Sequence, residues 1–568
     1  MARYLSDLDD IYFNLFTVLK AQNKNKDFGL EEIKSIISEF DKFVGNEIFP
    51  TREEGDLVGV KMEGGRVIAP KSYLKAKNNY HSNGWFGLGV EEAWGGMPAP
   101  QAVYMACQSL FVGSNVSFSM YPGLTKGAFN AIRTIGNKEQ KELILPKIME
   151  GTWGGTMCLT EPGAGSDVGA TKTSAKPLGN GIYEIKGVKI FISSGESDLY
   201  ENNIHLVLAR TPNAPAGVKG LSLFVVPRFK IKPDGSIGES NDVICTKIEH
   251  KMGIHGSATC ELTFGDKGGC QGQLLGKEFE GISNMFIMMN EARLLCAVQG
   301  ESQGNLATLN AIKYAKERAQ FGAEIIKHPD VRRMLLKMRA MGRGMRGLVL
   351  YTANLFDLEH ENADEIAFLT PICKSYCTDW GFNLSVDAVQ VHGGYGYCSE
   401  YGMEQFIRDT KIATIYEGTN GIQAMDFVMR KILKDQGKVY GKVIQKIVTS
   451  ISGEIPAAFS SEVELIKESV KNSQEIMGYF KELITQGNPN KILEHCMDFL
   501  NFSGNLLISW ILLEHAKEAN KLLKDDPNGF FQSKISDFKV FCSQYLGNNK
   551  AFAHAILNSK MELSKIEI

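Results

Sequence analysis

The chain has 568 residues, of which 43% are hydrophobic and 22% are charged, a composition that excludes a mainly disordered or fibrous protein. Its 62 lysine and arginine residues against 65 aspartate and glutamate residues give a net charge of -3. This balance argues against a nucleic-acid binder, because phosphate recognition usually shows as a basic excess. A chain of this length is expected to form roughly three to five structural units.

Three features of the sequence favour a cytoplasmic protein without a membrane span. The most apolar stretches, such as residues 506–513, are shorter than the ~18–20 residues that a membrane-spanning helix needs. Asp7, Asp9 and Asp10 stand where a signal peptide would have a basic start. The 11 cysteines have no repeating spacing, which favours reduced thiols over a disulfide framework or a metal site. We therefore expect no bound metal.

The first half of the chain predicts a helical domain followed by a β domain. Residues 1–155 contain helical segments that end at glycine or asparagine, so we expect a mainly helical N-terminal domain. Residues 156–281 change to short alternating runs rich in β-branched and aromatic residues, separated by turn-forming residues. This pattern predicts a central β-barrel or β-sandwich domain.

The second half of the chain is predicted to be helical throughout. Residues 282–433 contain four long helical segments, the number that closes a four-helix bundle. Residues 434–568 are predicted to form an additional helical tail domain, in which Ser461 and Glu464 have the spacing of a capping box. The predicted fold class is therefore multi-domain α+β.

The first dense motif is CLTEPGAGSDVGATKT, residues 158–173. Its glycines spell GxGxxxG, and Pro162 interrupts the strand-to-helix transition that a dinucleotide-binding fingerprint requires. The segment therefore fits a strand followed by a loop whose backbone N–H groups and hydroxyls of Thr160 and Ser166 meet a planar ligand. A simple cluster of β-turns explains the same residues equally well.

Two further clusters carry groups that could act on a ligand. Glu417 follows a helical stretch between Tyr416 and a glycine, which suits a general base whose pKa rises when a ligand displaces water. Arg318 precedes a turn from which it could reach a pyrophosphate, and Gly393 and Gly394 would allow close approach of a phosphate or adenine. A surface glutamate, a solvated arginine and a helix stop are the alternative interpretations.

Taken in order, with a β unit between two helical units, these clusters resemble the acyl-CoA dehydrogenase flavoprotein family. TEPGAGSD and IYEGT are the most specific motifs, and the resemblance covers roughly residues 75–433. The helical tail resembles the extension of a larger subgroup of the family. The resemblance implies a helical N-terminal domain, a central β domain and a four-helix bundle. It also implies FAD bound between these domains and across a subunit boundary, so at least a homodimer.

The resemblance assigns residues to the cofactor and to the substrate. Many members of the family carry Trp where this chain has Phe191. Residues implied to contact FAD are Thr160, Ser166, Phe191, Ser193, Arg318, Gly393, Gly394 and Thr419, and residues implied to contact the acyl-CoA are Asn290, Arg293 and Tyr416.

Glu417 is implied to be the base that removes the α-proton of the acyl group, while the β-hydrogen leaves as hydride to the flavin. The developing enolate needs hydrogen bonds to the thioester carbonyl, and the family provides one from the backbone N–H of this glutamate. Some members place the base directly before the arginine that matches Arg293. Here that residue is Ala292, and Glu291 points about 100° around the helix, which favours Glu417.

The resemblance therefore predicts FAD-dependent α,β-dehydrogenation of an acyl-CoA to the trans-2-enoyl-CoA, as in fatty acid β-oxidation, with electrons passed to an electron-transfer flavoprotein. One alternative is an acyl-CoA oxidase, which would use the same residues but allow oxygen to reach the reduced flavin. Another is a non-catalytic scaffold with the same fold.

Overall fold

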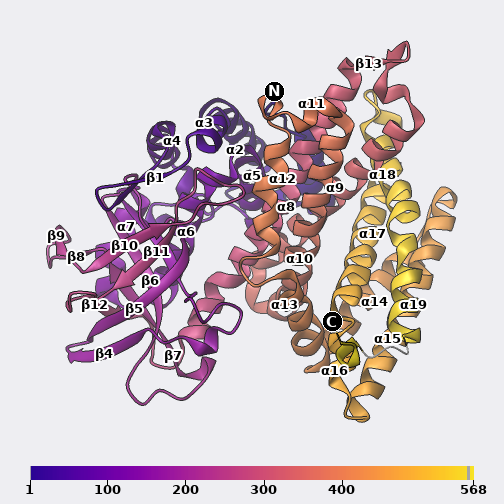
Figure 1. Ribbon diagram of the computed structural model, residues 1–568. Helices are drawn as coiled ribbons and strands as arrows, with labels where there is room; N and C mark the ends of the chain where they lie inside the picture. The colour runs from indigo at the N-terminus through magenta and orange to yellow at the C-terminus, as the bar shows by residue number, and fades with distance from the viewer. Residues whose placement is uncertain (1, 560–562, 568) are drawn as a thin grey trace. The chain divides into compact units, whose positions relative to one another are not determined.

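The computed structural model describes residues 2–559 and 563–567, with the side chains of residues 286–290 and 564 outside the described set. The chain forms two compact units, each built from separate parts of the sequence (Figure 1). The sheet unit comprises Glu39–Ala99 and Ser114–Ala292. The helical unit comprises Met1–Ser38, Pro100–Gly113 and Arg293–Ile568.

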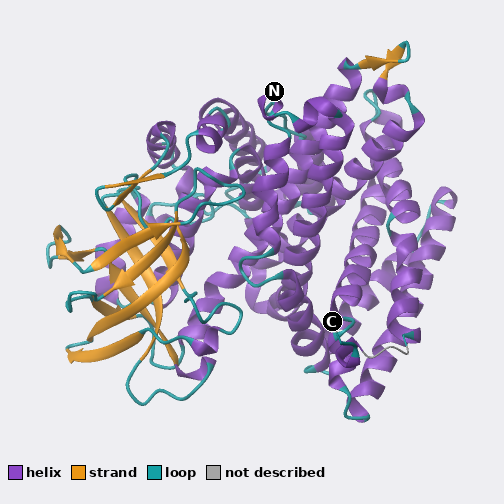
Figure 2. Cartoon of the chain, in the orientation of Figure 1, coloured by secondary structure: helices purple, strands orange, loops and turns teal. Residues whose placement is uncertain are grey.

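The sheet unit is organised around an eight-stranded sheet, drawn in orange in Figure 2. Its strand order is β10-β11-β5-β12-β7-β6-β3, and β4 pairs with β5 and β6. Within the described residues no pairing joins β10 to β3, so the sheet is open and is not a closed barrel. Its strands are β3 (Trp153–Cys158), β4 (Ser174–Gly179), β5 (Ile182–Ser193), β6 (Asn202–Arg210), β7 (Leu221–Pro227), β10 (Val243–Ile248), β11 (Thr259–Phe264) and β12 (Gln271–Leu274).

Helices α6 and α7 pack against strand β3 of this sheet. The close approach of α6 requires a residue without a side chain, because a Cβ at Gly155 would lie 2.5 Å from Cβ of Ala128. Helix α7 begins with a capping box in which Asn137 and Gln140 each bond the other's backbone N–H. The helices of this unit are α3 (Thr51–Leu57), α4 (Lys71–Ser82), α6 (Val116–Ile135) and α7 (Lys138–Met149), with the two-stranded pairs β1 (Lys61–Glu63) with β2 (Arg66–Ile68) and β8 (Phe229–Ile231) with β9 (Ile237–Ser240).

The helical unit contains the predicted bundle and the predicted tail together. Its first helices are α1 (Leu8–Tyr12) and α5 (Gln101–Ser114), and α2 (Leu30–Phe43) runs on into the sheet unit. The bundle helices are α8 (Gly281–Glu317), which begins in the sheet unit, α9 (Pro329–Leu355), α10 (Glu359–His392), α11 (Gly394–Tyr397), α12 (Glu404–Lys411) and α13 (Asn420–Met425), followed by a π-helical segment (Asp426–Leu433). The tail helices are α14 (Lys438–Ser452), α15 (Ser460–Thr485), α16 (Pro489–Leu493), α17 (Cys496–Leu522), α18 (Phe530–Gln544) and α19 (Asn549–Asn558).

The tail packs on the bundle through glycines of α9, and helices α9, α17 and α18 lie side by side in Figure 1. A Cβ at Gly344 would lie 2.4 Å from Cγ2 of Ile508, and one at Gly347 would lie 2.7 Å from Cγ2 of Ile511. Helix α9 therefore meets α17 at a distance that only glycine permits. The tail shares one hydrophobic core with the bundle.

One helical stretch, Cys496–Asp525, is long and apolar enough by length and composition to cross a membrane, the single such case among the described residues. It has 30 residues and its most apolar window has a mean hydropathy of 1.4, so it exceeds the length expected from the sequence. However, 83% of that window is buried inside the structure, as it is in the core helix of a soluble protein. The stretch is thus weak evidence for a membrane span.

The architecture confirms the predicted fold class, with a helical N-terminal region, a central sheet and helical C-terminal parts. The predicted capping box is wrong. Ser461 is not the N-cap, because helix α15 already begins at Ser460, directly after a 3₁₀ turn (Ala457–Phe459). The hydroxyl of Ser461 instead donates to Glu462, its neighbour in the first turn.

Candidate active site

Glu417 lies on a left-handed turn between a 3₁₀ turn (Ile412–Thr414) and α13. Glu417 has φ +55° and Gly418 has φ +82°, and such a conformation is strained for a residue with a side chain. The turn is held by two buried side chains. Nε2 of Gln423 donates to the carbonyl of Glu417 at 3.0 Å, and Nζ of Lys374 donates to the carbonyl of Gly418 at 2.8 Å. These two bonds fix the main chain that carries the Glu417 carboxylate.

Burial and nearby cations act on the Glu417 carboxylate in opposite directions. Burial raises its pKa above the ordinary value, and the charges of Arg293 on α8 and Lys374 on α10 limit that rise. Burial also lowers the pKa of Lys374 to about 8, although Cys296 and Glu417 both favour its charged form. The result is a carboxylate with a raised proton affinity that still has compensating positive charge beside it, as a general base requires.

The same part of the helical unit contains other predicted residues. The hydroxyl of Tyr416 donates to Oε1 of Gln299 on α8. Arg293 is buried, and burial lowers its pKa while Asp426 and Glu417 favour its charge. Thr419 is the N-cap of α13, and its hydroxyl accepts the N–H of Ile422 at 3.3 Å. The structure thus brings Tyr416, Glu417 and Arg293 together.

Asn290 and Glu291 come shortly before Arg293 in α8. The side chain of Asn290, predicted to contact the substrate, lies outside the described residues. Glu291 accepts a hydrogen bond of 2.7 Å from Asn130 on α6, within the sheet unit. Its carboxylate is therefore engaged with a helix of that unit.

Arg318 and the glycine pair form a second group in the helical unit. Arg318 follows α8 and precedes a short hairpin, β13 (Ala319–Gln320) and β14 (Ala323–Glu324). Its guanidinium carbon lies 5.4 Å from the centre of the Tyr395 ring, on the helix that begins at Gly394. A Cβ at Gly393 or Gly394 would meet nothing within 4 Å. Arg318 therefore lies beside a segment whose backbone is open to a ligand.

The sheet unit carries the remaining predicted residues. Phe191 and Ser193 lie at the end of β5, and Thr160 and Ser166 lie in the motif loop. The carbonyl of Thr160, just after β3, accepts the N–H of Ile190 at 2.9 Å, which ties the motif loop to β5. Phe191 has φ +57° opposite a register shift between Cys260 and Leu262, and its side chain is 59% exposed. Ser193 pairs with Thr259 two residues further along.

An exposed aromatic ring in a unit that also carries the hydroxyl residues Thr160 and Ser193 suits a planar, hydrogen-bonding ring system such as a flavin. Ser166, on the exposed part of the motif loop, adds a further hydroxyl. The side chains present in the sheet unit therefore fit one face of a flavin, and the Arg318 group fits an anionic cofactor part.

Sequence reasoning missed several residues that organise these groups. Lys374, Gln423 and Gln299 hold the segment around Glu417, and Glu161 anchors the motif loop through four hydrogen bonds. A signal existed for Lys374, because a single lysine in an apolar helical run is rarely left unpaired. The two glutamines carry no comparable signal in the sequence.

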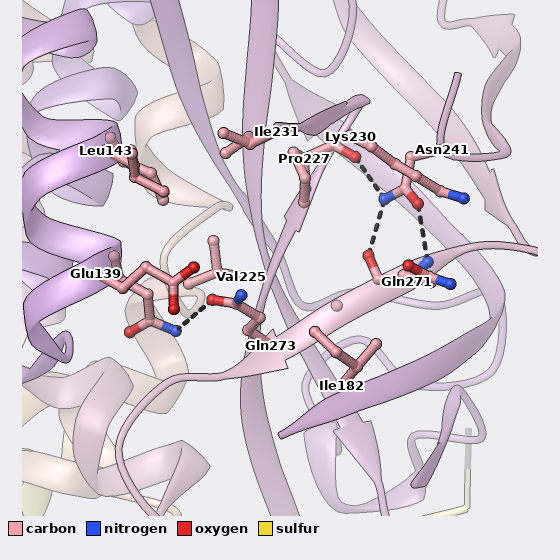
Figure 3. Close-up of a pocket in the computed structure, with 13 residues that line it drawn as sticks. Glu139, Leu143, Ile182, Val225, Pro227, Lys230, Ile231, Asn241, Gln271 and Gln273 are labelled. Carbon is pink, nitrogen blue, oxygen red and sulfur yellow. Dashed lines mark hydrogen bonds between the residues drawn. The ribbon is translucent and has the colours of Figure 1, made fainter. Parts of the chain in front are cut away.

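A cavity of about 160 Å³ lies elsewhere, between α7 and strands β7 and β12 of the sheet unit (Figure 3). Leu143, Val225 and Ile231 supply apolar walls. Its amides bond the protein itself, since Nδ2 of Asn241 donates to the carbonyls of Pro227 and Gln271 at 2.7 and 2.8 Å. The residues that line it include none of the predicted site residues, so it is separate from the candidate site.

The order of helical, sheet and helical segments is that of the acyl-CoA dehydrogenase class of oxidoreductases. Four family models match in order along the chain. They are the acyl-CoA dehydrogenase N-terminal domain at residues 31–152, the middle domain at 156–267, the C-terminal domain at 280–433 and an acetyl-CoA dehydrogenase C-terminal-like domain at 441–567.

A curated relative, the 3-methylmercaptopropionyl-CoA dehydrogenase of Ruegeria pomeroyi, is 36% identical and the match covers 96% of each chain. The chain belongs to the acyl-CoA dehydrogenase family, a family of FAD-dependent oxidoreductases that act on CH–CH groups.

Many solved structures share the fold. An acyl-CoA dehydrogenase of Bacillus anthracis complexed with FAD superposes with a TM-score of 0.75 at 22% identity, covering 94% of this chain and 90% of that one. A structure described as the electron transferring flavoprotein of Acidaminococcus fermentans gives a TM-score of 0.60 at 30% identity, covering 70% of this chain and 98% of that one.

Proposed function

We propose that the protein catalyses α,β-dehydrogenation of an acyl-CoA thioester to the trans-2-enoyl-CoA, with Glu417 as the base. The single observation that supports this most directly is the Glu417 turn, in which a carboxylate of raised pKa lies beside Arg293 and Lys374. Membership of the acyl-CoA dehydrogenase family supplies the reaction class.

In this mechanism Glu417 takes the α-proton, and its backbone N–H donates to the thioester carbonyl as enolate character develops. Bound FAD supplies the acceptor for the β-hydrogen, which leaves as hydride. Arg293 orients the CoA part, with Asn290 one turn earlier on α8, and Tyr416 lines the acyl side next to the base. A bound acyl group excludes water, which raises the proton affinity of Glu417 further.

Eight residues would hold FAD. In the sheet unit Thr160, Ser166, Phe191 and Ser193 would meet the flavin ring. In the helical unit Thr419 would bond the cofactor next to the base. Arg318 would bind the pyrophosphate of the neighbouring subunit, beside Gly393 and Gly394, so the active assembly is at least a homodimer.

The electrons would pass to an electron-transfer flavoprotein. Support comes from the similarity to the Acidaminococcus fermentans structure, whose description names an electron transferring flavoprotein. The pathway would be fatty acid β-oxidation or a related degradation of acyl-CoA.

Anaerobic mixing of the FAD-loaded protein with an acyl-CoA tests the proposal. Bleaching of the flavin absorption bands is expected for the wild type, and Glu417→Gln is expected to stay yellow without bleaching. Glu291→Gln is the matched control, because that carboxylate bonds Asn130 and should leave bleaching intact. Reduction of Glu417→Gln at the wild-type rate would remove Glu417 from the mechanism. A high peroxide yield on readmitting air would identify an oxidase instead.

A further inference from the structure

Lys374 is a fully buried lysine on α10, in a helical segment that is otherwise mostly apolar. Its ammonium donates to the carbonyl of Gly418 and to Oδ1 of Asn420, both at 2.8 Å. Burying a charged ammonium costs several kcal/mol unless it is paired and hydrogen-bonded. Both of these partners are neutral and both belong to the segment that carries Glu417. The ammonium of Lys374 is therefore hydrogen-bonded directly to the segment that carries Glu417.

The contacts of Lys374 fix the main chain that follows Glu417. Nδ2 of Asn420 donates back to α10, to the carbonyl of Ser375 at 3.2 Å and to Oγ1 of Thr378 at 3.0 Å. Gln423 holds the preceding carbonyl, that of Glu417 itself. Two successive carbonyls of the left-handed turn are thus each held by a different buried side chain.

The charged and titratable groups of the helical unit that face Glu417 come from three segments. Helix α8 contributes Arg293 and Cys296, helix α10 contributes Lys374, and the Glu417 segment contributes Tyr416. Asp379 lies five residues further along α10 and favours the charged form of Lys374. Lys374 and Arg293 are the two cations in this set, and Lys374 also bonds the main chain of the turn.

We propose that Lys374 is a positioning residue for Glu417, whose ammonium fixes the turn that carries the base and stabilises the ionised carboxylate. This inference rests on the proposed function of Glu417. The two effects have different consequences. Fixing the turn sets how fast the proton is removed at any pH, whereas the charge sets the pH above which the base is ionised.

Because the charge of Lys374 opposes the effect of burial on Glu417, removing it should raise the pKa of Glu417 further. The acidic limb of the rate of flavin reduction against pH should then move to higher pH. Lys374 itself, with its pKa lowered to about 8, is mostly charged near neutral pH, where the base must be ionised.

The test compares Lys374→Met with Gln423→Leu, using single-turnover flavin reduction by an acyl-CoA in the FAD-loaded protein. Lys374→Met loses the bonds to the carbonyl of Gly418 and to Asn420, and Gln423→Leu loses the bond to the carbonyl of Glu417. Both variants should therefore slow reduction, but only Lys374→Met loses the charge. The acidic limb is expected to rise by about one pH unit in Lys374→Met and to stay in place in Gln423→Leu. Lys374→Gln, which keeps a donor but no charge, should show the same shift and serves if the methionine variant does not fold.

A second readout is independent of turnover. The carboxyl band of Glu417, isolated as the infrared difference between wild type and Glu417→Gln in the protein without FAD, should titrate at higher pH in the Lys374→Met background. An unchanged limb and an unchanged carboxyl titration would overturn the role of Lys374, as would an equal shift in Gln423→Leu. Flavin reduction that survives in Glu417→Gln would instead overturn the proposed function, so the two failures are distinct.

Discussion

Asp10, in the first helix, accepts a hydrogen bond of 2.6 Å from Nζ of Lys534 on α18, 524 residues further along the chain, and both side chains are fully buried. Asp10 also accepts from Nη1 of Arg346 on α9 at 3.0 Å. Arg343 on the same helix bonds Asp537 of α18. The first helix, the bundle and the tail therefore share one buried ionic network.

Substituting Asp10 should destabilise the helical unit strongly. Asp10→Asn leaves Lys534 and Arg346 buried with reduced compensation, and breaking a buried pair in this way costs about 3–5 kcal/mol. Thermal or urea unfolding measures the loss. Glu39→Gln is the matched control, because Glu39 pairs with Lys42 at the surface, where the side chains are 59% and 63% exposed. That change should cost less than about 1 kcal/mol. Equal losses in the two variants would contradict the network.

The lowered pKa of Asp10 predicts how the free energy of unfolding depends on pH. Burial alone would raise the pKa of Asp10, but the charges of Lys534, Arg343 and Arg346 outweigh it and hold the pKa well below the ordinary 3.8. A lowered pKa means that the contribution to stability is complete above about pH 3.8 and is lost as the pH falls below that value. The difference in unfolding free energy between wild type and Asp10→Asn should therefore be constant near neutral pH and shrink below about pH 3.8. A difference that grows on acidification would show the opposite linkage.

The four hydrogen bonds that Glu161 accepts hold the motif loop in place, and we expect FAD binding to depend on them. Its carboxylate accepts the N–H groups of Lys172 and Thr173 at 2.7 and 3.0 Å, the Thr173 hydroxyl at 2.6 Å and Nζ of Lys189 at 2.9 Å. Glu161→Gln cannot accept all four and leaves the Lys189 ammonium buried, so the loop that carries Thr160 should loosen.

We expect FAD affinity of Glu161→Gln to fall on the order of tenfold, measured by flavin release on dialysis or by fluorescence titration. Glu142→Gln is the control, because Glu142 is 61% exposed and its ion pair with Lys138 is long at 3.8 Å. Wild-type affinity in Glu161→Gln would show that the loop does not depend on this anchor.

Local patterns predicted the helices and strands and indicated Glu417 as a candidate base, but long-range contacts decide how the elements pair and pack. The alternating runs predicted strands, yet the pairing that leaves β10 and β3 as open ends depends on residues far apart in sequence. The capping-box spacing at Ser461 was misleading because the 3₁₀ turn before α15, with buried Phe459, sets where the helix begins.

In the candidate site, too, a local pattern is visible in the sequence but the long-range contacts are not. Glu417 followed by glycine is visible in the sequence, since a left-handed turn favours glycine at one of its positions. The partners of that turn, Lys374 and Gln423, come from α10 and α13, and no spacing rule relates α10 to the turn. Likewise, Gly344 and Gly347 do not reveal from the sequence that α17 packs on them.

Gly418 and Gly421 are three residues apart and have opposite surroundings. Gly418 has φ +82°, and an added Cβ would lie 2.7 Å from Nε2 of Gln423, the donor that holds Glu417. Gly418→Ala should therefore strain the turn by about 1–3 kcal/mol and displace the carboxylate. Flavin reduction by an acyl-CoA should slow on the order of 10- to 100-fold, because small misplacements of a catalytic group have effects of that size.

Gly421 is the matched control, since it lies in α13 and a Cβ there would meet nothing within 4 Å. Gly421→Ala should leave the rate unchanged and stabilise the protein by about 0.4–1 kcal/mol, because alanine restricts the unfolded chain more than glycine does. Single-turnover flavin reduction and thermal unfolding of the two variants give both comparisons. A normal rate in Gly418→Ala would mean that proton removal does not depend on the left-handed turn.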